Sequence, residues 1–417
     1  MYSPFLSLIF IFLMLGSALG FSSISWSSTL NTLDGYIVTV KSGSNLSRHL
    51  AEVQSWTPGF PNSTTDTKKR SFVSHQYSIG DFQGYAGRFD PFTIQKLHAH
   101  HEVLNIERDL VSSIKSPTER RKRSIVTQRT SSYGLQQISQ RASGSPDQKY
   151  FYDSSAGSQT FAYLLDTGIF AEHLEFQGRA SFGYDATKTC RCTPSCPGAC
   201  KDRDGHGTHV AGIVGSRTWG VAKRCSMIAV KVGTRDSVQL SKLLDVLQWA
   251  VDEIEERSRQ SRAVIAITVT VPYSAALNGA VSAAYRRGVS TVTAAGNDNH
   301  DAKQSSPGSS QAAITVAASD VQRHRASFSN WGPAVDLFAP GVGIYSTWIG
   351  DRAATRAQSG TSQACAYVAG VVLYLKGLHD LRDASTTRDR LLALATRGVV
   401  RNTGNTANVF VYNGSGR

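Results

Sequence analysis

Three short segments of the chain carry an acid, a base and a nucleophile, in that order. They are Asp166-Thr167-Gly168, Gly205-His206-Gly207-Thr208-His209 and Gly360-Thr361-Ser362. A serine hydroxyl attacks a carbonyl near neutral pH only when an imidazole takes its proton, and a carboxylate must orient that imidazole and stabilise its charged form. The sequence therefore predicts a catalytic triad of Asp166, His206 and Ser362 that performs acyl transfer.

The order Asp, His, Ser is the one that the subtilisins use, and it differs from the orders on other folds. With these flanking residues the chain resembles the subtilases, and within them the secreted fungal branch typified by proteinase K. The resemblance runs from about Tyr133 to Tyr412, with an inhibitor-like prosegment before it. It implies a serine endopeptidase that acts on protein or peptide substrates, needs no cofactor for catalysis and is inhibited as a zymogen by its own propeptide.

The resemblance also implies roles for residues around the triad. Asn297 matches the family's oxyanion asparagine, and the apolar run after Ser362 predicts a helix whose free N–H groups help to hold the same anion. A family Ser-Leu-Gly-Gly edge is replaced here by Thr-Val-Thr-Val-Pro at 268–272, and the opposite edge aligns near 235–238. The residues expected to bind substrate are Val271, Pro272, Ala294, Ala295 and Gly296.

Two departures from the family keep a second reading open. Most subtilases continue after the nucleophile with Met-Ala-Thr-Pro-His, whereas residues 363–367 here are Gln-Ala-Cys-Ala-Tyr. Without that proline an N–H returns to the first helical turn, and Pro272 cannot donate a hydrogen bond to a substrate strand. The alternative is a secreted binding protein with a subtilase fold and little or no turnover.

The amino-terminal end predicts secretion. Residues 5–15 are almost wholly apolar, and Ala18-Leu19-Gly20 offers small residues at a signal-peptidase spacing. We therefore expect a signal peptide over residues 1–20, an extracellular protein and no membrane association after the signal is removed. The net charge of +13 has one dense cluster, Arg120-Arg121-Lys122-Arg123, so nucleic-acid binding is a poor explanation of it.

Secretion places the six cysteines in an oxidising compartment. Cys190, Cys192, Cys196 and Cys200 are close in sequence, and we expect a disulfide-stapled loop with three pairings open. We expect this loop to form one rim of the substrate cleft, because His206 follows shortly. Cys365, on an apolar helix, is predicted to be a small buried residue. Glycosylation sequons begin at Asn45, Asn62 and Asn413.

The chain is predicted to contain an inhibitor-like propeptide over 21–123 and a peptidase domain over 124–417. Strands at 35–40, 82–89 and 103–106 with helices at 47–56 and 91–101 indicate a small α+β, βαβ-like prosegment. Residues 112–123 are polar and aperiodic and indicate a processing linker. We expect a separate basic-specific protease to cut between Arg123 and Ser124.

After residue 132, apolar strands alternate with helical patterns. This predicts an α/β fold with a parallel sheet covered by helices on both faces and the active residues at the carboxyl ends of the strands. The expected strands are 161–165, 227–232, 264–271, 290–294 and 314–317, and the expected helices 241–255 and 277–286. By resemblance, Asp320 matches the carboxylate of a structural calcium site.

Overall fold

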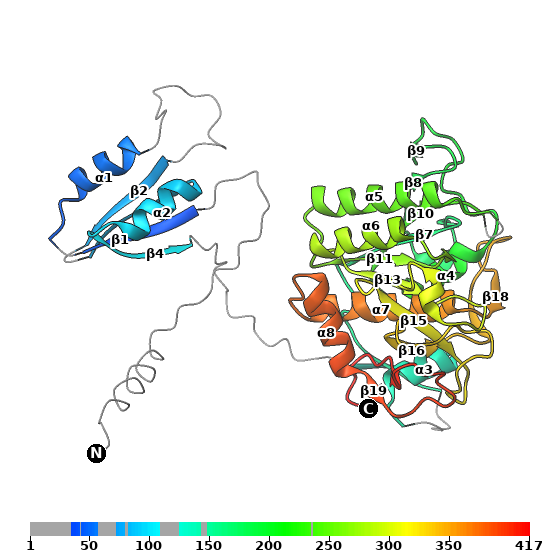
Figure 1. Cartoon of the computed structure of the whole chain (residues 1–417). Coiled ribbons are helices and arrows are strands. Elements are labelled where there is room, and N and C mark those ends of the chain that lie inside the picture. The colour runs from blue at the N-terminus through cyan, green and yellow to red at the C-terminus, as the bar shows by residue number, and fades with distance from the viewer. Residues whose placement is uncertain are drawn as a thin grey trace, which may run out of the picture. The chain divides into compact units, whose positions relative to one another are not determined.

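The chain has 417 residues. The computed structural model describes residues 35–41, 43–56, 72–79, 82–108, 125–142, 148–234 and 237–417. It separates into two compact units, Met1–Arg120 and Arg121–Arg417 (Figure 1). The predicted signal peptide, the linker over 112–123 and the cleavage site at Arg123 and Ser124 lie outside the described residues, so these boundaries stay predictions. Within the described ranges, no helix is both long and apolar enough to cross a membrane.

The first unit is a small α+β domain. Its elements are β1 (Gly35–Val40), α1 (Leu46–Ser55), β2 (Phe72–Ile79), β3 (Phe82–Arg88), α2 (Pro91–Ala99) and β4 (Val103–Arg108). The four strands form an antiparallel sheet in the order β2-β3-β1-β4. The predicted α+β prosegment is confirmed, with its three strands and two helices, but the prediction missed β2, whose apolar residues are interrupted by Ser, His and Gln.

The second unit is built on a ten-stranded sheet in the order β19-β20-β16-β15-β13-β11-β7-β10-β8-β9. All neighbouring pairs are parallel except at the two edges, β19 and β9. The strands are β7 (Phe161–Asp166), β8 (Ala180–Asp185), β9 (Cys190–Arg191), β10 (Ser226–Lys231), β11 (Ala263–Ile267), β13 (Thr291–Ala294), β15 (Ile314–Ser319), β16 (Leu337–Pro340), β19 (Thr396–Arg397) and β20 (Val409–Phe410).

Helices cover both faces of this sheet, as Figure 1 shows, and this confirms the predicted fold class. Successive side chains of a strand point to opposite faces, so Ala162 and Leu164 of β7 pack with α4 (His206–Gly215) and α7 (Thr361–Leu378). Tyr163 and Leu165 pack with α5 (Leu240–Glu256) and α6 (Ala275–Arg286) on the other face. The remaining helices are α3 (Tyr133–Ser139) and α8 (Ala384–Leu394), and the short strands are β5 (Ile125–Gln128), β6 (Tyr150–Asp153), β12 (Val271–Pro272), β14 (Ser305–Ser306), β17 (Ile344–Thr347) and β18 (Thr355–Gln358).

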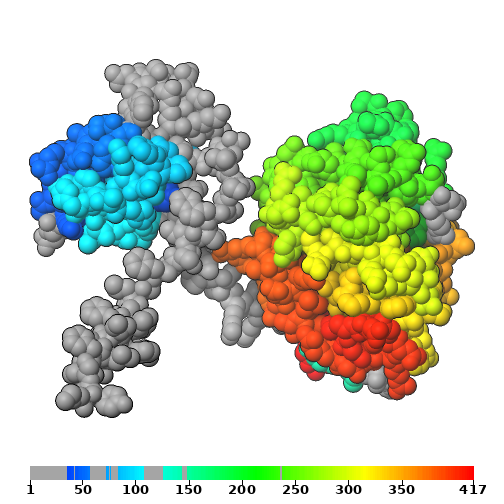
Figure 2. Space-filling model, viewed as in Figure 1, coloured from blue at the N-terminus to red at the C-terminus, as the bar shows by residue number. Residues whose placement is uncertain are grey.

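The carboxyl-terminal segment packs against this unit, and Figure 2 shows it in red at the surface. Asn413 is only 1 % exposed; its N–H donates to the Ile138 carbonyl and its side-chain amide to the Phe151 carbonyl. A glycan cannot be attached to a side chain in this position of the folded chain, so the structure excludes Asn413 as a glycosylation site. Asn45 is exposed and caps α1, and Asn62 lies outside the described residues.

One predicted strand is shorter than expected. The apolar run 264–271 indicated a single strand, but β11 ends at Ile267 and residues 268–270 leave the sheet. The chain pairs again only at β12, which lies antiparallel to β14. This early end places Thr268 at the carboxyl edge of the sheet, next to the end of β7.

Candidate active site

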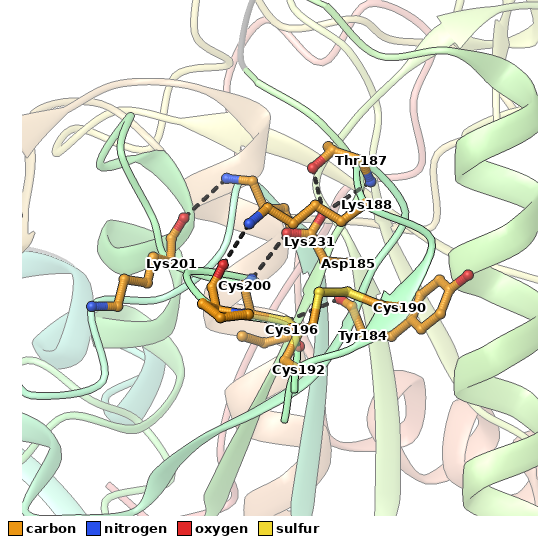
Figure 3. Close-up of a disulfide and its surroundings, with 12 residues drawn as sticks. Tyr184, Asp185, Thr187, Lys188, Cys190, Cys192, Cys196, Cys200, Lys201 and Lys231 are labelled. Atoms are coloured by element: carbon orange, nitrogen blue, oxygen red, sulfur yellow. Dashed lines mark hydrogen bonds between the residues drawn. A yellow bond between two sulfur atoms is a disulfide. The ribbon is translucent and has the colours of Figure 1, made fainter. Parts of the chain in front are cut away.

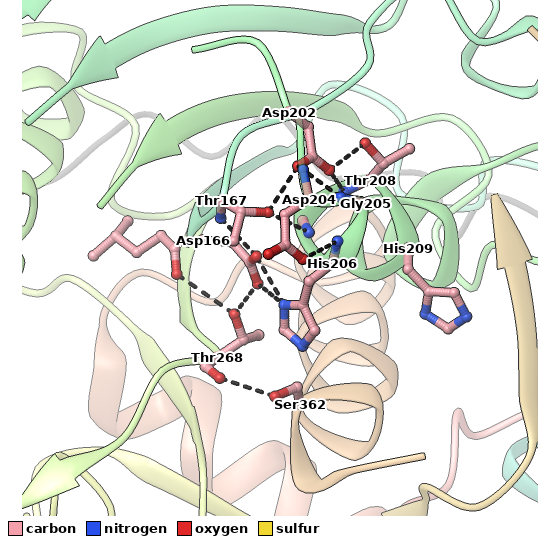
Figure 4. Close-up of polar contacts among 12 residues, drawn as sticks. Asp166, Thr167, Asp202, Asp204, Gly205, His206, Thr208, His209, Thr268 and Ser362 are labelled. Atoms are coloured by element: carbon pink, nitrogen blue, oxygen red, sulfur yellow. Dashed lines mark hydrogen bonds and ion pairs between the residues drawn. The ribbon is translucent and has the colours of Figure 1, made fainter. Parts of the chain in front are cut away.

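Four elements bring the predicted triad together. Asp166 is the last residue of β7, His206 begins α4 and Ser362 is the second residue of α7. Thr268 follows β11, the neighbour of β7, and the carboxyl ends of parallel strands meet at one edge of a sheet. These four residues and Asn297 line one cavity of about 330 Å³. Figure 4 shows the side chains converging there.

The acid and the base are held in direct contact. Nδ1 of His206 lies 2.8 Å and 2.9 Å from the two carboxylate oxygens of Asp166. The Asp166 side chain is 1 % exposed and that of His206 17 %, so the pair is shielded from water on the carboxylate side. Burial alone would raise the pKa of Asp166, but the charge and hydrogen bond of His206 and the hydroxyl of Thr268 lower it. The carboxylate therefore stays ionised and fixes the proton of His206 on Nδ1.

Thr268 supports this pair in a way that the motif does not reveal. Its hydroxyl donates to Oδ2 of Asp166, and its backbone carbonyl accepts from Oγ of Ser362. The sequence suggested a strand residue here, and only the end of β11 at Ile267 exposes these groups to the site. Thr268 is thus a positioning residue for both the acid and the nucleophile.

Thr268→Val is expected to lower kcat about 10-fold and to leave KM unchanged. Valine keeps the volume but removes a hydrogen bond to a buried charge, which contributes about 1.5–3 kcal/mol. Thr293→Val is the matched control, because Thr293 is also buried but donates to the Ile267 carbonyl, away from Asp166. Steady-state kinetics on a short peptide separate the two parameters. Equal kcat in both variants would contradict the role of Thr268.

The nucleophile stands at the start of a buried helix. Ser362 is 6 % exposed, and its hydroxyl donates to the Thr268 carbonyl at 2.9 Å. Figure 4 shows the second ring nitrogen of His206 on the side of Ser362. Proton transfer to His206 therefore requires the Ser362 hydroxyl to turn away from the Thr268 carbonyl. As the second residue of α7, Ser362 also has a backbone N–H without a partner in the preceding helical turn.

Asn297 is oriented as a donor toward the cavity. Its Oδ1 accepts from the N–H of Thr361 at 2.8 Å and from the Thr361 hydroxyl at 2.9 Å. A backbone N–H can only donate, so the atom facing it must be the amide oxygen, and the amide nitrogen is turned to the other side. That orientation suits a group that stabilises an oxyanion beside Ser362.

Asp202 organises the loop that carries His206, and the sequence analysis missed it. One carboxylate oxygen accepts from the Thr167 hydroxyl and the N–H groups of Asp204 and Gly205 at 2.9–3.0 Å. The other accepts from the N–H and hydroxyl of Thr208 at 2.8 Å and 2.6 Å. The available signal was an aspartate four residues before the start of a helix, where a side-chain acceptor can satisfy the free N–H groups of the first turn.

The loop closed by the two disulfides contacts the segment that follows Asp166. The disulfides are Cys190–Cys196 and Cys192–Cys200, one of the three open pairings (Figure 3). The carbonyl of Cys200 accepts from the N–H of Ile169, and a Cβ on Gly168, whose φ is +112°, would lie 2.4 Å from that carbonyl. The glycine of the Asp-Thr-Gly segment is therefore needed for this close approach.

The loop does not form the rim that we expected. Residues 190–200 are absent from the lining of the triad cavity, and Lys201 and Asp202 line a neighbouring cavity of about 320 Å³. Cys225 and Cys365 are free thiols and fully buried, which confirms the prediction for Cys365. Burial raises the pKa of both thiols, so neither is activated as a thiolate.

The residues that replace the family's Met and Pro fit into a regular helix. Gln363 is buried, and its amide nitrogen lies 3.4 Å from Nδ1 of His209. Nε2 of His209 lies 3.0 Å from the carbonyls of Ile344 and Arg356, so this nitrogen carries the proton and Nδ1 accepts. His209 is therefore a neutral structural partner of Gln363. The helix α7 starts at Thr361 and continues without a break although it lacks the proline.

The buried His209 predicts a loss of stability in acid. Burial lowers its pKa from 6.5 to about 4 in the folded chain. Between these pH values the unfolded chain binds a proton that the folded chain does not, so the free energy of unfolding falls as the pH drops from 6.5 to 4. The loss is on the order of 3 kcal/mol at the acid end of this window and is absent above it.

Urea unfolding at several pH values checks this expectation. A Ser362→Ala background prevents self-digestion, and His209→Gln should flatten the slope of stability against pH below 6.5. His300→Gln is the control, because it makes the same exchange at a partly exposed side chain. A slope that survives in His209→Gln would show that another group causes it.

Unlike the triad, the five residues predicted to bind substrate do not line the cavity. Residues 268–270 line the cavity, whereas Val271 and Pro272 pair with β14 and are not among its lining residues. Ala294, Ala295 and Gly296 are buried and are not among its lining residues either. Part of the opposite edge, residues 235 and 236, lies outside the described residues, and Thr234 and Val238 flank it at the cavity. The substrate contacts of the five predicted residues stay a prediction.

Asp320 is a poor fit for the predicted calcium ion. Its Oδ1 accepts from the N–H groups of Gln322 and His324 at 2.9 Å and 2.8 Å, and Oδ2 lies 3.5 Å from Nδ1 of His324. The carboxylate thus closes a turn and faces an imidazole, while calcium prefers a shell of oxygen ligands. Among the described residues, no further acidic side chain joins Asp320 in a cluster of three ligands.

Comparisons with known proteins agree with this geometry. The subtilase family matches residues 157–412, and the peptidase inhibitor I9 family matches residues 35–115. An alkaline proteinase of Hapsidospora chrysogena is 43 % identical over 386 residues, 91 % of this chain and 92 % of the relative. Alkaline protease 1 of Emericella nidulans is 40 % identical over 91 % of both chains.

A solved structure is also similar. It is the crystal structure of a cold adapted subtilisin-like serine proteinase, with a TM-score of 0.63 and 33 % identity, covering 68 % of this chain and 98 % of the other. The family matches together span both units, and the relatives align over nearly the whole length. The chain therefore belongs to the subtilase family of serine endopeptidases and carries an I9 inhibitor prosegment.

Proposed function

We propose that this chain is a secreted endopeptidase made as an inactive precursor, and that Asp166, His206 and Ser362 carry its chemistry. The observation that supports this most strongly is the contact of both carboxylate oxygens of buried Asp166 with Nδ1 of His206, in the cavity that holds Ser362. An ionised carboxylate in this place orients the imidazole and stabilises its protonated form, which a general base for serine requires.

The proposed reaction follows from the positions of these groups. His206 takes the proton of Ser362 as Oγ attacks the substrate carbonyl, and the amide nitrogen of Asn297 and the N–H of Ser362 bind the oxyanion. Protonated His206 then gives its proton to the leaving amine, and the C–N bond breaks. Water, deprotonated by His206, hydrolyses the acyl-enzyme and restores Ser362.

The substrates proposed are proteins and peptides bound in an extended form. The chain segment 268–270 leaves the sheet beside Ser362, and Thr234 and Val238 line the facing side of the cavity. A strand laid between two backbone segments gains main-chain hydrogen bonds from either side. Thr270 lines this cavity where the family has a glycine, so we propose a narrower first subsite that prefers small side chains.

The prosegment is proposed to inhibit the peptidase unit until it is removed. The match to the inhibitor family over residues 35–115 supports this role. We expect a basic-specific secretory protease to cut after Arg123, so amino-terminal sequencing of the mature protein should begin at Ser124. A Ser362→Ala precursor should be cut at the same bond, because the cut is made by another enzyme. Cleavage that disappears in Ser362→Ala would point to self-processing.

Secretion remains part of the proposal. The apolar segment at residues 5–15, the two disulfides and the likeness to fungal alkaline proteases support it. Fusing residues 1–20 to a reporter tests whether they direct export. A structural calcium ion at Asp320 is left out of the proposal, because the carboxylate is already engaged with Gln322 and His324.

Hydrolysis by the purified mature protein tests the function. Incubation with a denatured protein and analysis of the fragments should show internal peptide-bond cleavage that a serine-directed inhibitor abolishes. Fragments with small residues before the cut would support the narrow first subsite. Tight binding of peptides without any cleavage would instead support the inactive binding protein as the function.

A further inference from the structure

The prosegment unit holds a cluster of metal-ligand side chains that the sequence analysis did not single out. His49 lies on α1, His100 follows α2, and Glu102 lies just before β4. One ligand atom from each of the three lies within 4.8 Å of the other two. Residues 49 and 102 are more than fifty positions apart in the sequence, so the fold itself brings the donors together.

His49 is a buried imidazole with one nitrogen left without a hydrogen bond. Its side chain is 0 % exposed, and Nε2 lies 3.0 Å from the hydroxyl of Tyr85, which is also fully buried. Nδ1 has no hydrogen-bond partner among the described residues, although Oε2 of Glu102 is 3.3 Å away. Buried polar atoms in proteins are nearly always paired, so this nitrogen indicates a missing partner.

A cation between these groups would supply that partner. In the tautomer that donates from Nε2 to the Tyr85 hydroxyl, Nδ1 keeps its lone pair 3.3 Å from the negative Oε2 of Glu102, and a cation bound to both atoms would relieve that contact. The Tyr85 hydroxyl would then act as the outer partner that orients a ligating histidine.

The remaining side chains complete the set of donors. Oε1 of Glu102 pairs with the Arg48 guanidinium, which leaves Oε2 for a metal. Nδ1 of His100 accepts from the N–H of Glu102 at 3.2 Å, so binding of an ion through Nε2 would move the ring proton to Nδ1 and release that N–H. Glu52, half exposed on the same helix as His49, lies 3.3 Å from Nε2 of His100 and offers a fourth ligand. Two imidazoles with carboxylates suit Zn²⁺ and similar transition metals, whereas calcium and magnesium prefer oxygen ligands alone.

We propose that the prosegment binds one divalent transition-metal cation of the Zn²⁺ type through His49, His100 and Glu102, with Glu52 as the fourth ligand. The ion would join α1 to the turn between α2 and β4. Because it binds the folded prosegment and not the unfolded one, zinc would stabilise this unit by mass action. In the precursor, the free energy of unfolding of the prosegment would therefore be higher when the metal is present.

The test uses the whole precursor with Ser362→Ala, purified without a histidine tag. Calorimetric titration with Zn²⁺ alone should show one site that His100→Ala weakens at least about 100-fold, and Tyr85→Phe should weaken it about 10-fold. The control is His98→Ala, since His98 is exposed on α2 and its loss should leave the affinity unchanged. Co²⁺ in the same site should give the visible absorption of a four-coordinate ion.

Several results would overturn the proposal. The affinity for Zn²⁺ would be the same in His100→Ala and His98→Ala if the ion bound elsewhere, for example to histidines of the larger unit. Equal binding of Ca²⁺ and Zn²⁺ would exclude an imidazole site. If His100→Ala fails to fold by circular dichroism, Tyr85→Phe and Glu102→Gln decide the question, because unchanged affinity in both would contradict the site.

Discussion

Replacing Ser362 with alanine is expected to lower kcat by about 10⁶-fold, the size of loss known for the nucleophile of the related enzyme subtilisin, and to leave KM close to that of the parent. The hydroxyl is the only group at this position that can form the acyl-enzyme, while the cavity and the oxyanion donors remain in place. Residual hydrolysis should therefore still exceed that in water, because Asn297 and the Ser362 backbone N–H are retained.

The matched control for this change is Ser282→Ala. Ser282 lies on α6, and its hydroxyl donates to the Asn278 carbonyl within the helix, far from the triad in sequence and structure. Its kcat should equal that of the parent, and circular dichroism should show both variants folded. A folded Ser362→Ala protein that keeps more than about one hundredth of the parent kcat would exclude Ser362 as the nucleophile.

Asp202→Asn is expected to lower both stability and kcat. Asp202 is buried, and its two oxygens accept five hydrogen bonds from the loop and first turn around His206. An amide group in place of one oxygen would face donors and leave at least one of them unpaired. We expect the free energy of unfolding to fall by about 3 kcal/mol and kcat to fall about 10-fold as His206 loses its fixed place.

Urea unfolding in the Ser362→Ala background measures the stability, and kinetics in the parent background measure kcat. Asp351→Asn is the control, because Asp351 also closes a turn through a backbone N–H but is exposed. It should change neither value. Normal stability and kcat in Asp202→Asn would show that the loop holds His206 without this carboxylate.

Much of the fold and the triad could be predicted from the sequence, because the signals are local. The Asp-Thr-Gly and Gly-His-Gly segments and the glycine before Thr361 are short, and the helices α5 and α6 have clear periodicity. An apolar strand that ends in an acid and is followed by Thr-Gly already indicates a residue at a sheet edge. Such features need no knowledge of distant parts of the chain.

The rest depends on contacts between residues far apart in the sequence. Thr268 serves Asp166 and Ser362 only because β11 ends early, which an unbroken apolar run hides. The sequon at Asn413 is a valid tripeptide, yet its side chain is buried against Phe151. Likewise, His49 and Glu102 become neighbours only when the prosegment sheet forms.

The central claim is that Ser362 is a nucleophile activated by His206. Labelling of the mature protein with a fluorophosphonate, followed by peptide mapping, tests it directly. We expect a single covalent adduct on Ser362, with none in Ser362→Ala and a rate of labelling at least about 100-fold lower in His206→Ala. No adduct on Ser362 in a folded protein, or labelling at the same rate without His206, would contradict the account.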